Sequence, residues 1–287
     1  MDATTICTGL HLPECPRWRD GALWFSDMWG EKVHRLSPDG TDEVVLELDD
    51  DPGGLGWLPD GDLLVVGMEH ANLWRWNGDT LRLHADLRPW AAWPCNDMTV
   101  ATDGTAYVTQ FGFDTWGGTT GRLAAPLIAV APDGTVTVAA DELMCPNGIA
   151  FDAAEHQVFV AEPAAMRISR FDRGPGGMLG NRVEFATLPP AEGAPYAPPD
   201  GLCVDAEGGV WAADPIGGQL VHFDSEGNVL EVIDHDQHTL ACTLGGDDGR
   251  TLFVCSAGEH HKPTRSDEPT GRVDAIRVDV PGSHRLP

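Results

Sequence analysis

The chain has 287 residues, of which 42% are hydrophobic and 22% are charged, so it carries enough apolar material for a sizeable core. Its 45 acidic and 18 basic residues give a formal net charge of −27. Such a field repels phosphate backbones and anionic lipid surfaces. We therefore expect neither nucleic acid nor a membrane surface as a partner.

The cysteine pattern and the first residues bear on location. Seven cysteines, an odd number without a CxxC pair, do not form the pattern of a disulfide framework or a zinc ribbon. The first residues lack the basic start and apolar run of a signal peptide. No stretch approaches the roughly 18 apolar residues of a membrane span. These features predict reduced thiols in a cytoplasmic protein.

Turn signals recur between short apolar segments along the chain. They are Pro38-Asp39-Gly40, Pro59-Asp60-Gly61, Thr102-Asp103-Gly104 and Pro132-Asp133-Gly134, with looser versions at Glu207-Gly208-Gly209 and Ser225-Glu226-Gly227. Asp-Gly permits the positive φ that tight hairpins require. Matching strands begin near residues 24, 64, 107, 159, 211 and 253, at steps of 40, 43, 52, 52 and 42. Units of this size with about four strands are typical of propeller blades.

The repeats predict an all-β fold in which residues 1–287 form one six-bladed β-propeller of four-stranded antiparallel blades. One complete blade comprises segments 147–151, 157–161, 167–171 and 182–186. We expect the first strand of each blade to be innermost. We also expect the short strand near Thr5-Ile6-Cys7 to pair with the last blade and close the ring, because closure removes an exposed sheet edge.

Equivalent positions of the repeats carry oxygen-bearing side chains. These positions lie 10 to 12 residues before the matching strands, and we call them ring positions. They are Glu14, Asn96, Asn147 and Asp200, while the same offset gives Gly53 and Cys242 in the other two repeats. Because six equivalent positions face one axis, their oxygens would converge at one mouth of the central channel. Carboxylate and amide oxygens suit Ca²⁺, Mg²⁺ or Mn²⁺ better than a thiolate-loving metal.

Each candidate ligand also has a simpler interpretation. Glu14 lies between two prolines, and a buried carboxylate needs a partner that a cation would supply; the alternative is a partly solvated channel carboxylate. Asn147 and Asp200 each precede a glycine and could form simple turns, but their ring positions favour a ligand role. Asn96 could bind the metal or donate to a substrate oxygen, and we expect a structural role for Asp97.

Two repeats carry an extra 11 or 12 residues between their second and third strands. The residue pairs that span these inserts are Tyr107 with Ala129 and Phe253 with Ile276. The inserts would overhang the mouth, where long loops commonly bind or cover a ligand. The first, residues 112–127, holds Phe113 and Trp116 as candidate pocket walls. The second holds Glu259, His260 and His261, which we interpret as loop residues.

Several motifs share their order and blade position with one known family. They are Pro13-Glu14-Cys15-Pro16-Arg17-Trp18, Trp24-Phe25-Ser26-Asp27, Cys95-Asn96-Asp97, Pro146-Asn147-Gly148 and Pro199-Asp200-Gly201-Leu202-Cys203-Val204-Asp205 with Gly209-Val210-Trp211. Over nearly its whole length the chain resembles the gluconolactonase, regucalcin and luciferin-regenerating enzyme family. The resemblance implies a six-bladed propeller with a divalent metal held by Glu14, Asn147 and Asp200. It also implies that Asn96 lies beside metal and substrate, with Asp200 as general base in lactone hydrolysis.

One position departs from the family pattern. Sugar-lactone members commonly place an arginine two residues before the matching asparagine, where this chain has Pro94. The guanidinium that would grip sugar hydroxyls is therefore missing. The aromatic residues Trp93, Phe113 and Trp116 indicate a small-molecule substrate that is less polar than a sugar lactone.

The leading functional prediction is a metal-dependent hydrolase that opens a lactone. Ca²⁺ is the first candidate ion, with Mg²⁺, Mn²⁺ or Zn²⁺ as alternatives, and an open metal site would polarise the ring carbonyl. A second hypothesis is a metal-free propeller enzyme that catalyses a strictosidine-synthase-like condensation, a cyclisation or an isomerisation. A third is a calcium-binding propeller without catalysis.

Overall fold

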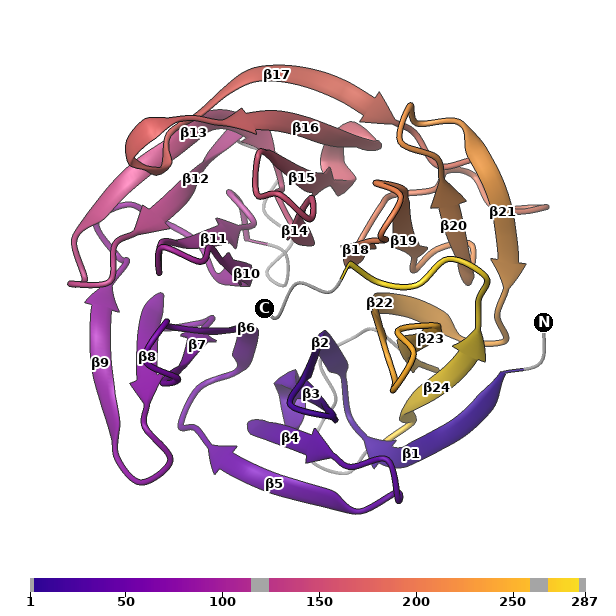
Figure 1. Ribbon diagram of the computed structural model, residues 1–287, viewed down its shortest axis with the longest axis horizontal. Coiled ribbons are helices and arrows are strands. Elements are labelled where there is room, and N and C mark those ends of the chain that lie inside the picture. The colour runs from indigo at the N-terminus through magenta and orange to yellow at the C-terminus, as the bar shows by residue number, and fades with distance from the viewer. Residues whose placement is uncertain (1–2, 115–123, 259–267, 284–287) are drawn as a thin grey trace.

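Six four-stranded antiparallel sheets surround a central axis in the computed structural model (Figure 1). The structure describes residues 3–114, 124–258 and 268–283. The predicted six-bladed β-propeller is confirmed. Within the described ranges, no helix is both long and apolar enough to cross a membrane.

The first three blades follow the chain without crossovers. Blade 1 contains β2 (Pro13–Arg19), β3 (Ala22–Asp27), β4 (Lys32–Leu36) and β5 (Asp42–Glu47). Blade 2 contains β6 (Pro52–Trp57), β7 (Leu63–Gly67), β8 (Asn72–Trp76) and β9 (Leu81–Asp86). Blade 3 contains β10 (Cys95–Val100), β11 (Ala106–Gln110), β12 (Ala124–Val130) and β13 (Val136–Met144). Each blade is thus a meander that begins at the axis and ends at the rim (Figure 1).

The next two blades repeat this plan, and the last one closes the ring. Blade 4 contains β14 (Ile149–Phe151), β15 (Gln157–Glu162), β16 (Arg167–Arg173) and β17 (Leu179–Ala186). Blade 5 contains β18 (Leu202–Val204), β19 (Val210–Asp214), β20 (Gln219–Phe223) and β21 (Val229–Asp234). Blade 6 contains β22 (His238–Gly245), β23 (Thr251–Ala257), β24 (Gly271–Arg277) and the N-terminal β1 (Thr4–Leu10). The predicted closure by the N-terminal strand is confirmed.

The predicted hairpin turns form where Asp-Gly pairs occur. Gly40, Gly61, Gly104 and Gly134 have φ of 84°, 92°, 85° and 87°, a left-handed conformation that suits glycine. Short 3₁₀ turns, η1 (Met28–Gly30) and η2 (Pro163–Ala165), follow the second strands of blades 1 and 4, and η3 (Pro175–Gly177) lies beyond β16. Because neighbouring strands are antiparallel, η1 and η2 lie at the mouth where the innermost strands begin.

The strand register corrects one ring position. The innermost strands pair Arg17 with Trp24, Cys203 with Trp211 and Thr243 with Phe253. The residue three positions before Arg17 is Glu14, and the residue three positions before Cys203 is Asp200. In blade 6, the residue three positions before Thr243 is Leu240. The prediction of Cys242 was therefore wrong. The hairpin of blade 6 is longer, with ten residues from Thr243 to Phe253 against eight from Cys203 to Trp211, so a constant offset from the second strand fails.

The two inserts also differ slightly from the prediction. Tyr107 pairs with Ala129 as expected, but Phe253 pairs with Ala275 rather than with Ile276. Leu127 lies inside β12, so part of the first insert lengthens a strand. Trp116 and residues 259–261 lie outside the described residues.

A buried carboxylate joins the closing strand to blade 6. Asp274 is 1% exposed and accepts hydrogen bonds from Thr5 Oγ1 at 2.6 Å and Arg272 Nε at 2.7 Å, while His235 Nε2 lies 2.9 Å from its Oδ2. Burial alone would raise the pKa of Asp274. The contacts with His235, Thr5 and Arg272 outweigh burial and hold this pKa at about 2.

Asp274→Asn should destabilise the protein, because it weakens charge-assisted contacts worth about 2 kcal/mol together. The folded pKa of about 2 lies below the unfolded value of roughly 3.9. The stability due to ionisation is therefore present above about pH 4 and is lost as the pH falls towards 2. Urea unfolding of both proteins should show a difference at pH 7 that shrinks below pH 4. The exposed Asp234→Asn is the control, and a difference unchanged down to pH 2 would contradict this account.

Candidate functional site

The starts of the innermost strands place four polar side chains around one mouth of the channel. Glu14 lies in β2 and Asn96 in β10, whereas Asn147 and Asp200 come two residues before β14 and β18. Glu14, Asn96 and Asp200 are buried and Asn147 is half-buried. These are four of the six ring positions; Gly53 and Leu240 occupy the other two.

The glycines after Asn147 and Asp200 permit close contact between blades. A Cβ at Gly148 would lie 2.5 Å from Asp200 O, and a Cβ at Gly201 would lie 2.3 Å from Ala241 Cβ. Neither glycine has a positive φ. The Asn-Gly and Asp-Gly pairs therefore do not form hairpin turns. They allow innermost strands to approach each other, and this approach brings neighbouring ring positions together.

The negative charge of Asp200 acts on Glu14. Burial is the main cause that raises the pKa of Glu14, and the Asp200 carboxylate adds to the rise. Cys15 donates its backbone N–H to Glu14 Oε2 at 3.1 Å, which opposes the rise. The Arg17 guanidinium also opposes the rise, as the smallest of these effects.

Asp200 is the second unusual carboxyl group of the ring. Burial, followed by the charges of Asp97 and Asp214, raises its pKa to about 8, although a hydrogen bond with the Asn147 side chain works against this rise. Its Oδ1 is buried and has no hydrogen-bond partner. A buried polar atom of this kind is costly unless another group satisfies it.

The residues at the mouth fit a divalent cation. Glu14, Asn147 and Asp200 offer two carboxylates and an amide, which are ligands for hard cations. A positive ion would also offset the neighbouring negative charges that, after burial, raise the pKa values of Glu14 and Asp200. Among the described residues, no group of three or more His, Cys, Asp or Glu side chains could hold a metal ion. A site at the mouth would therefore need the Asn147 amide as a ligand.

Asp97 has the structural role expected of it. Its Oδ1 lies 2.6 Å from Arg17 Nη2 and accepts the backbone N–H of Met98 at 2.7 Å. Arg17 also donates to the backbone oxygens of Leu55, Pro16 and Met98 at 3.2, 2.8 and 2.5 Å. This buried ion pair thus joins the innermost strands of blades 1, 2 and 3.

The role of Arg17 was missed from the sequence. The available signal was its place three residues after Glu14 on the innermost strand, a position where a charged side chain must find partners in other blades. The motif around Glu14 contains Arg17, but its partner Asp97 lies 80 residues away in blade 3.

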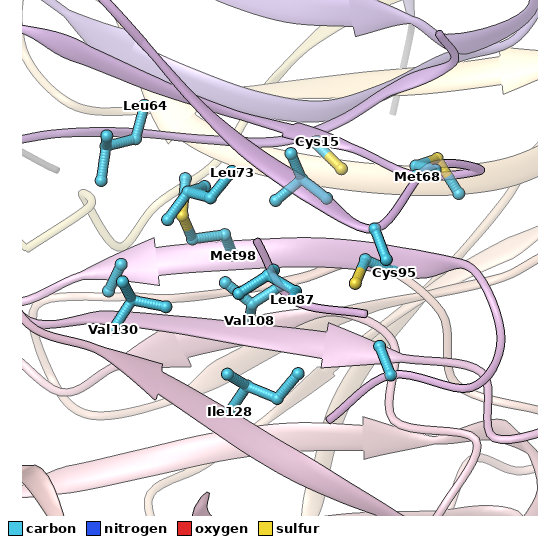
Figure 2. Packing of buried hydrophobic residues seen from close by; sticks show 14 of the residues in the cluster. Cys15, Leu64, Met68, Leu73, Leu87, Cys95, Met98, Val108, Ile128 and Val130 are labelled. Carbon is cyan, nitrogen blue, oxygen red and sulfur yellow. The ribbon is translucent and has the colours of Figure 1, made fainter. Parts of the chain in front are cut away.

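Apolar side chains surround the polar ring positions. One large hydrophobic cluster includes residues near the start of an innermost strand or the end of a second strand, and five of them come from blades 1, 2 and 6. We call these residues the mouth cluster: Cys15, Met28, Met68, Leu240 and Ala257. Figure 2 shows Cys15, Met68 and Cys95 towards one end of the larger cluster, away from Leu64 and Val130.

Two of the aromatic residues singled out in the sequence, Phe113 and Trp93, lie in different surroundings. Phe113 is partly buried and packs against the cluster that contains the mouth residues, as does Trp29 of η1. Trp93 lines a groove together with His70 and Arg88. All seven cysteines are free, and burial raises the pKa of Cys95 to about 12 and that of Cys15 well above its usual value. These two thiols are therefore protonated at neutral pH.

Comparison with known proteins identifies the family. The model of the SMP-30/Gluconolactonase/LRE-like region matches residues 12–258. The chain belongs to this family. A 6-deoxy-6-sulfogluconolactonase of Pseudomonas putida is 27% identical over 280 residues, covering 94% of this chain and 92% of the relative. Regucalcin of Gallus gallus is 25% identical over 256 residues, covering 86% and 83%.

Solved structures share the fold of this family member. A luciferin-regenerating enzyme superposes with a TM-score of 0.83 at 17% identity, covering 99% of this chain and 98% of the other. A regucalcin from Agrobacterium tumefaciens, described as a calcium-binding protein, gives a TM-score of 0.77 at 21% identity, covering 96% and 92%. The lactonase names among the sequence relatives indicate hydrolase chemistry on lactones in this family.

Gly201→Ala should lower stability by roughly 1–3 kcal/mol, because its Cβ would clash with Ala241 of the neighbouring blade. Gly180→Ala is the control, because a Cβ there meets nothing within 4 Å. Thermal unfolding followed by circular dichroism measures both effects. Equal melting temperatures for the two variants would refute close blade contact at Gly201.

Proposed function

We propose that this protein hydrolyses a lactone with the help of one divalent cation held by Glu14, Asn147 and Asp200. The observation that carries the proposal is the buried Asp200 carboxyl, whose Oδ1 has no partner and which raises the pKa of the equally buried Glu14. Ca²⁺ is our first choice because the donors are all oxygen; Mg²⁺, Mn²⁺ and Zn²⁺ are alternatives. Relatives that bear lactonase names support the reaction class.

The side chains of this chain have separate roles in the proposed reaction. When bound, the cation would polarise the lactone carbonyl. Asp200 accepts a proton from the attacking water as the water oxygen bonds to the carbonyl carbon. Asn96 donates its amide N–H to the developing oxyanion. The ring C–O bond then breaks, the leaving alkoxide takes up the proton held by Asp200, and the product is a hydroxy acid.

The proposed substrate is a small molecule that is less polar than a sugar lactone. Pro94 offers no side-chain hydrogen bond to a sugar hydroxyl. The mouth cluster and Phe113 provide apolar surface beside the ring positions. A hydroxyl placed against such surface would lose its hydrogen bonds to water without gaining others.

A second candidate function is calcium binding without catalysis. The description of the Agrobacterium tumefaciens regucalcin as a calcium-binding protein favours it. Both candidates require the same ligands, so they differ only in turnover.

The test is hydrolysis of a lactone panel, measured by acid release before and after chelation. We expect activity to disappear with the chelator and to return with Ca²⁺. Asp200→Ala should lose roughly 100-fold or more in kcat/KM, because it removes both a proton acceptor and a cation ligand. Asp234→Ala, an exposed aspartate on β21 of the same blade, should keep full activity.

Three outcomes separate the candidates. Tight Ca²⁺ binding without turnover of any lactone would favour the non-catalytic function. Hydrolysis that survives exhaustive chelation would refute the need for a cation. Full activity of a folded Asp200→Ala protein would refute the role of Asp200.

A further inference from the structure

We infer that Leu240 determines substrate specificity and that it selects lactones with an alkyl substituent. The inference rests on the proposed function and deepens it, because it names both the substrate class and the residue that recognises it. Four ring positions carry oxygen-bearing side chains and Gly53 carries none, whereas Leu240 places an apolar side chain in the same ring.

Two independent observations place Leu240 in the ring. The pairing of Thr243 with Phe253 puts it at the position of Glu14 and Asp200 in their blades. In addition, the Gly201 N–H donates to Leu240 O at 2.8 Å. Gly148 lies against Asp200 in the same way, because a Cβ added at Gly148 would lie 2.5 Å from Asp200 O.

Leu240 packs in a different hydrophobic cluster from the residues that follow it on β22. Ala241 and Cys242, which follow it on β22, belong to two other hydrophobic clusters with residues of the adjacent blades. Leu240 instead belongs to the large cluster that contains Cys15, Met28 and Ala257 and extends to β7 and β11 of blades 2 and 3. Its exposed fraction of 3% equals that of Asn96, so these two ring residues are equally covered.

The order of the blades puts Leu240 between the two carboxylates. Blade 6 lies between blade 5, which carries Asp200, and blade 1, which carries Glu14 (Figure 1). A lactone whose carbonyl approaches these carboxylates therefore has Leu240 as a neighbour.

The next ring positions extend the apolar side. Gly53 has no side chain, and a Cβ there would lie 3.0 Å from Met68 Cγ. On either side of Glu14, the ring positions of blades 6 and 2 thus carry Leu240 and a glycine, while those of blades 3, 4 and 5 carry two amides and a carboxylate. The lactone carbonyl would approach Glu14 and Asp200, and an alkyl arm would lie against Leu240.

The energetic consequence is a preference that grows with chain length. Each methylene that leaves water for an apolar surface improves kcat/KM roughly fourfold if it is buried in the transition state. A sugar lactone would place a hydroxyl against the Leu240 side chain, which offers it no hydrogen bond.

The experiment compares δ-valerolactone, two δ-lactones with progressively longer alkyl chains, and glucono-1,5-lactone, which share one ring size. The wild type should prefer the alkyl lactones over glucono-1,5-lactone, with kcat/KM rising along the alkyl series. Leu240→Asn should reduce the ratio of alkyl-lactone to glucono-lactone kcat/KM by about tenfold or more. Leu240→Met should preserve this ratio.

The exposed Leu230→Asn on β21 is the control and should leave activity and ratio unchanged. If Leu240→Asn does not fold, Leu240→Ala replaces it, and its ratio should fall in the same direction. A wild type that prefers glucono-1,5-lactone, or a folded Leu240→Asn protein with an unchanged ratio, would overturn the inference.

Failure of the proposed function gives a different result. If no lactone is hydrolysed, the reaction is wrong, and calorimetric binding of the same four compounds then tests Leu240. Tighter binding of alkyl lactones that weakens in Leu240→Asn supports the inference; equal or tighter binding of glucono-1,5-lactone overturns it.

Discussion

The burial of two carboxylates, Glu14 and Asp200, beside further negative charges is the constraint on which the site depends. Closure of the ring brings them together from blades 1 and 5, and burial followed by the Asp200 charge raises the pKa of Glu14. The guanidinium of Arg17 does not resolve this, because it pairs with Asp97 and three backbone oxygens. A cation offsets such a cost, and without one the carboxyl groups are protonated more readily.

The propeller supplies this arrangement through features that lie outside the ring positions. Pairing of β1 with β24 fixes the last blade beside the first. Gly148 and Gly201 let innermost strands approach closely enough for their ring positions to meet. The mouth therefore depends on contacts spread over the whole chain, and the order of the blades sets which side chains are neighbours there.

Much of this organisation could be predicted from the sequence, because propeller blades repeat local signals. Asp-Gly turns and the spacing of apolar strands gave the six blades and the closing strand, and Glu14 and Asp200 followed from equivalent positions. Leu240 was missed because the offset was counted through a hairpin whose length varies between blades. The partnership of Arg17 with Asp97 was missed because it joins separate blades, and no local pattern encodes a contact over 80 residues.

The central claim is that Glu14, Asn147 and Asp200 converge on one divalent cation. The most direct measurement is a crystal structure of the protein grown with Mn²⁺, with anomalous diffraction recorded at the manganese edge. The account predicts a single strong anomalous peak at the channel mouth, with oxygen atoms of these three side chains around it at roughly 2.1–2.4 Å. No peak there, or a peak held by other residues, would contradict it.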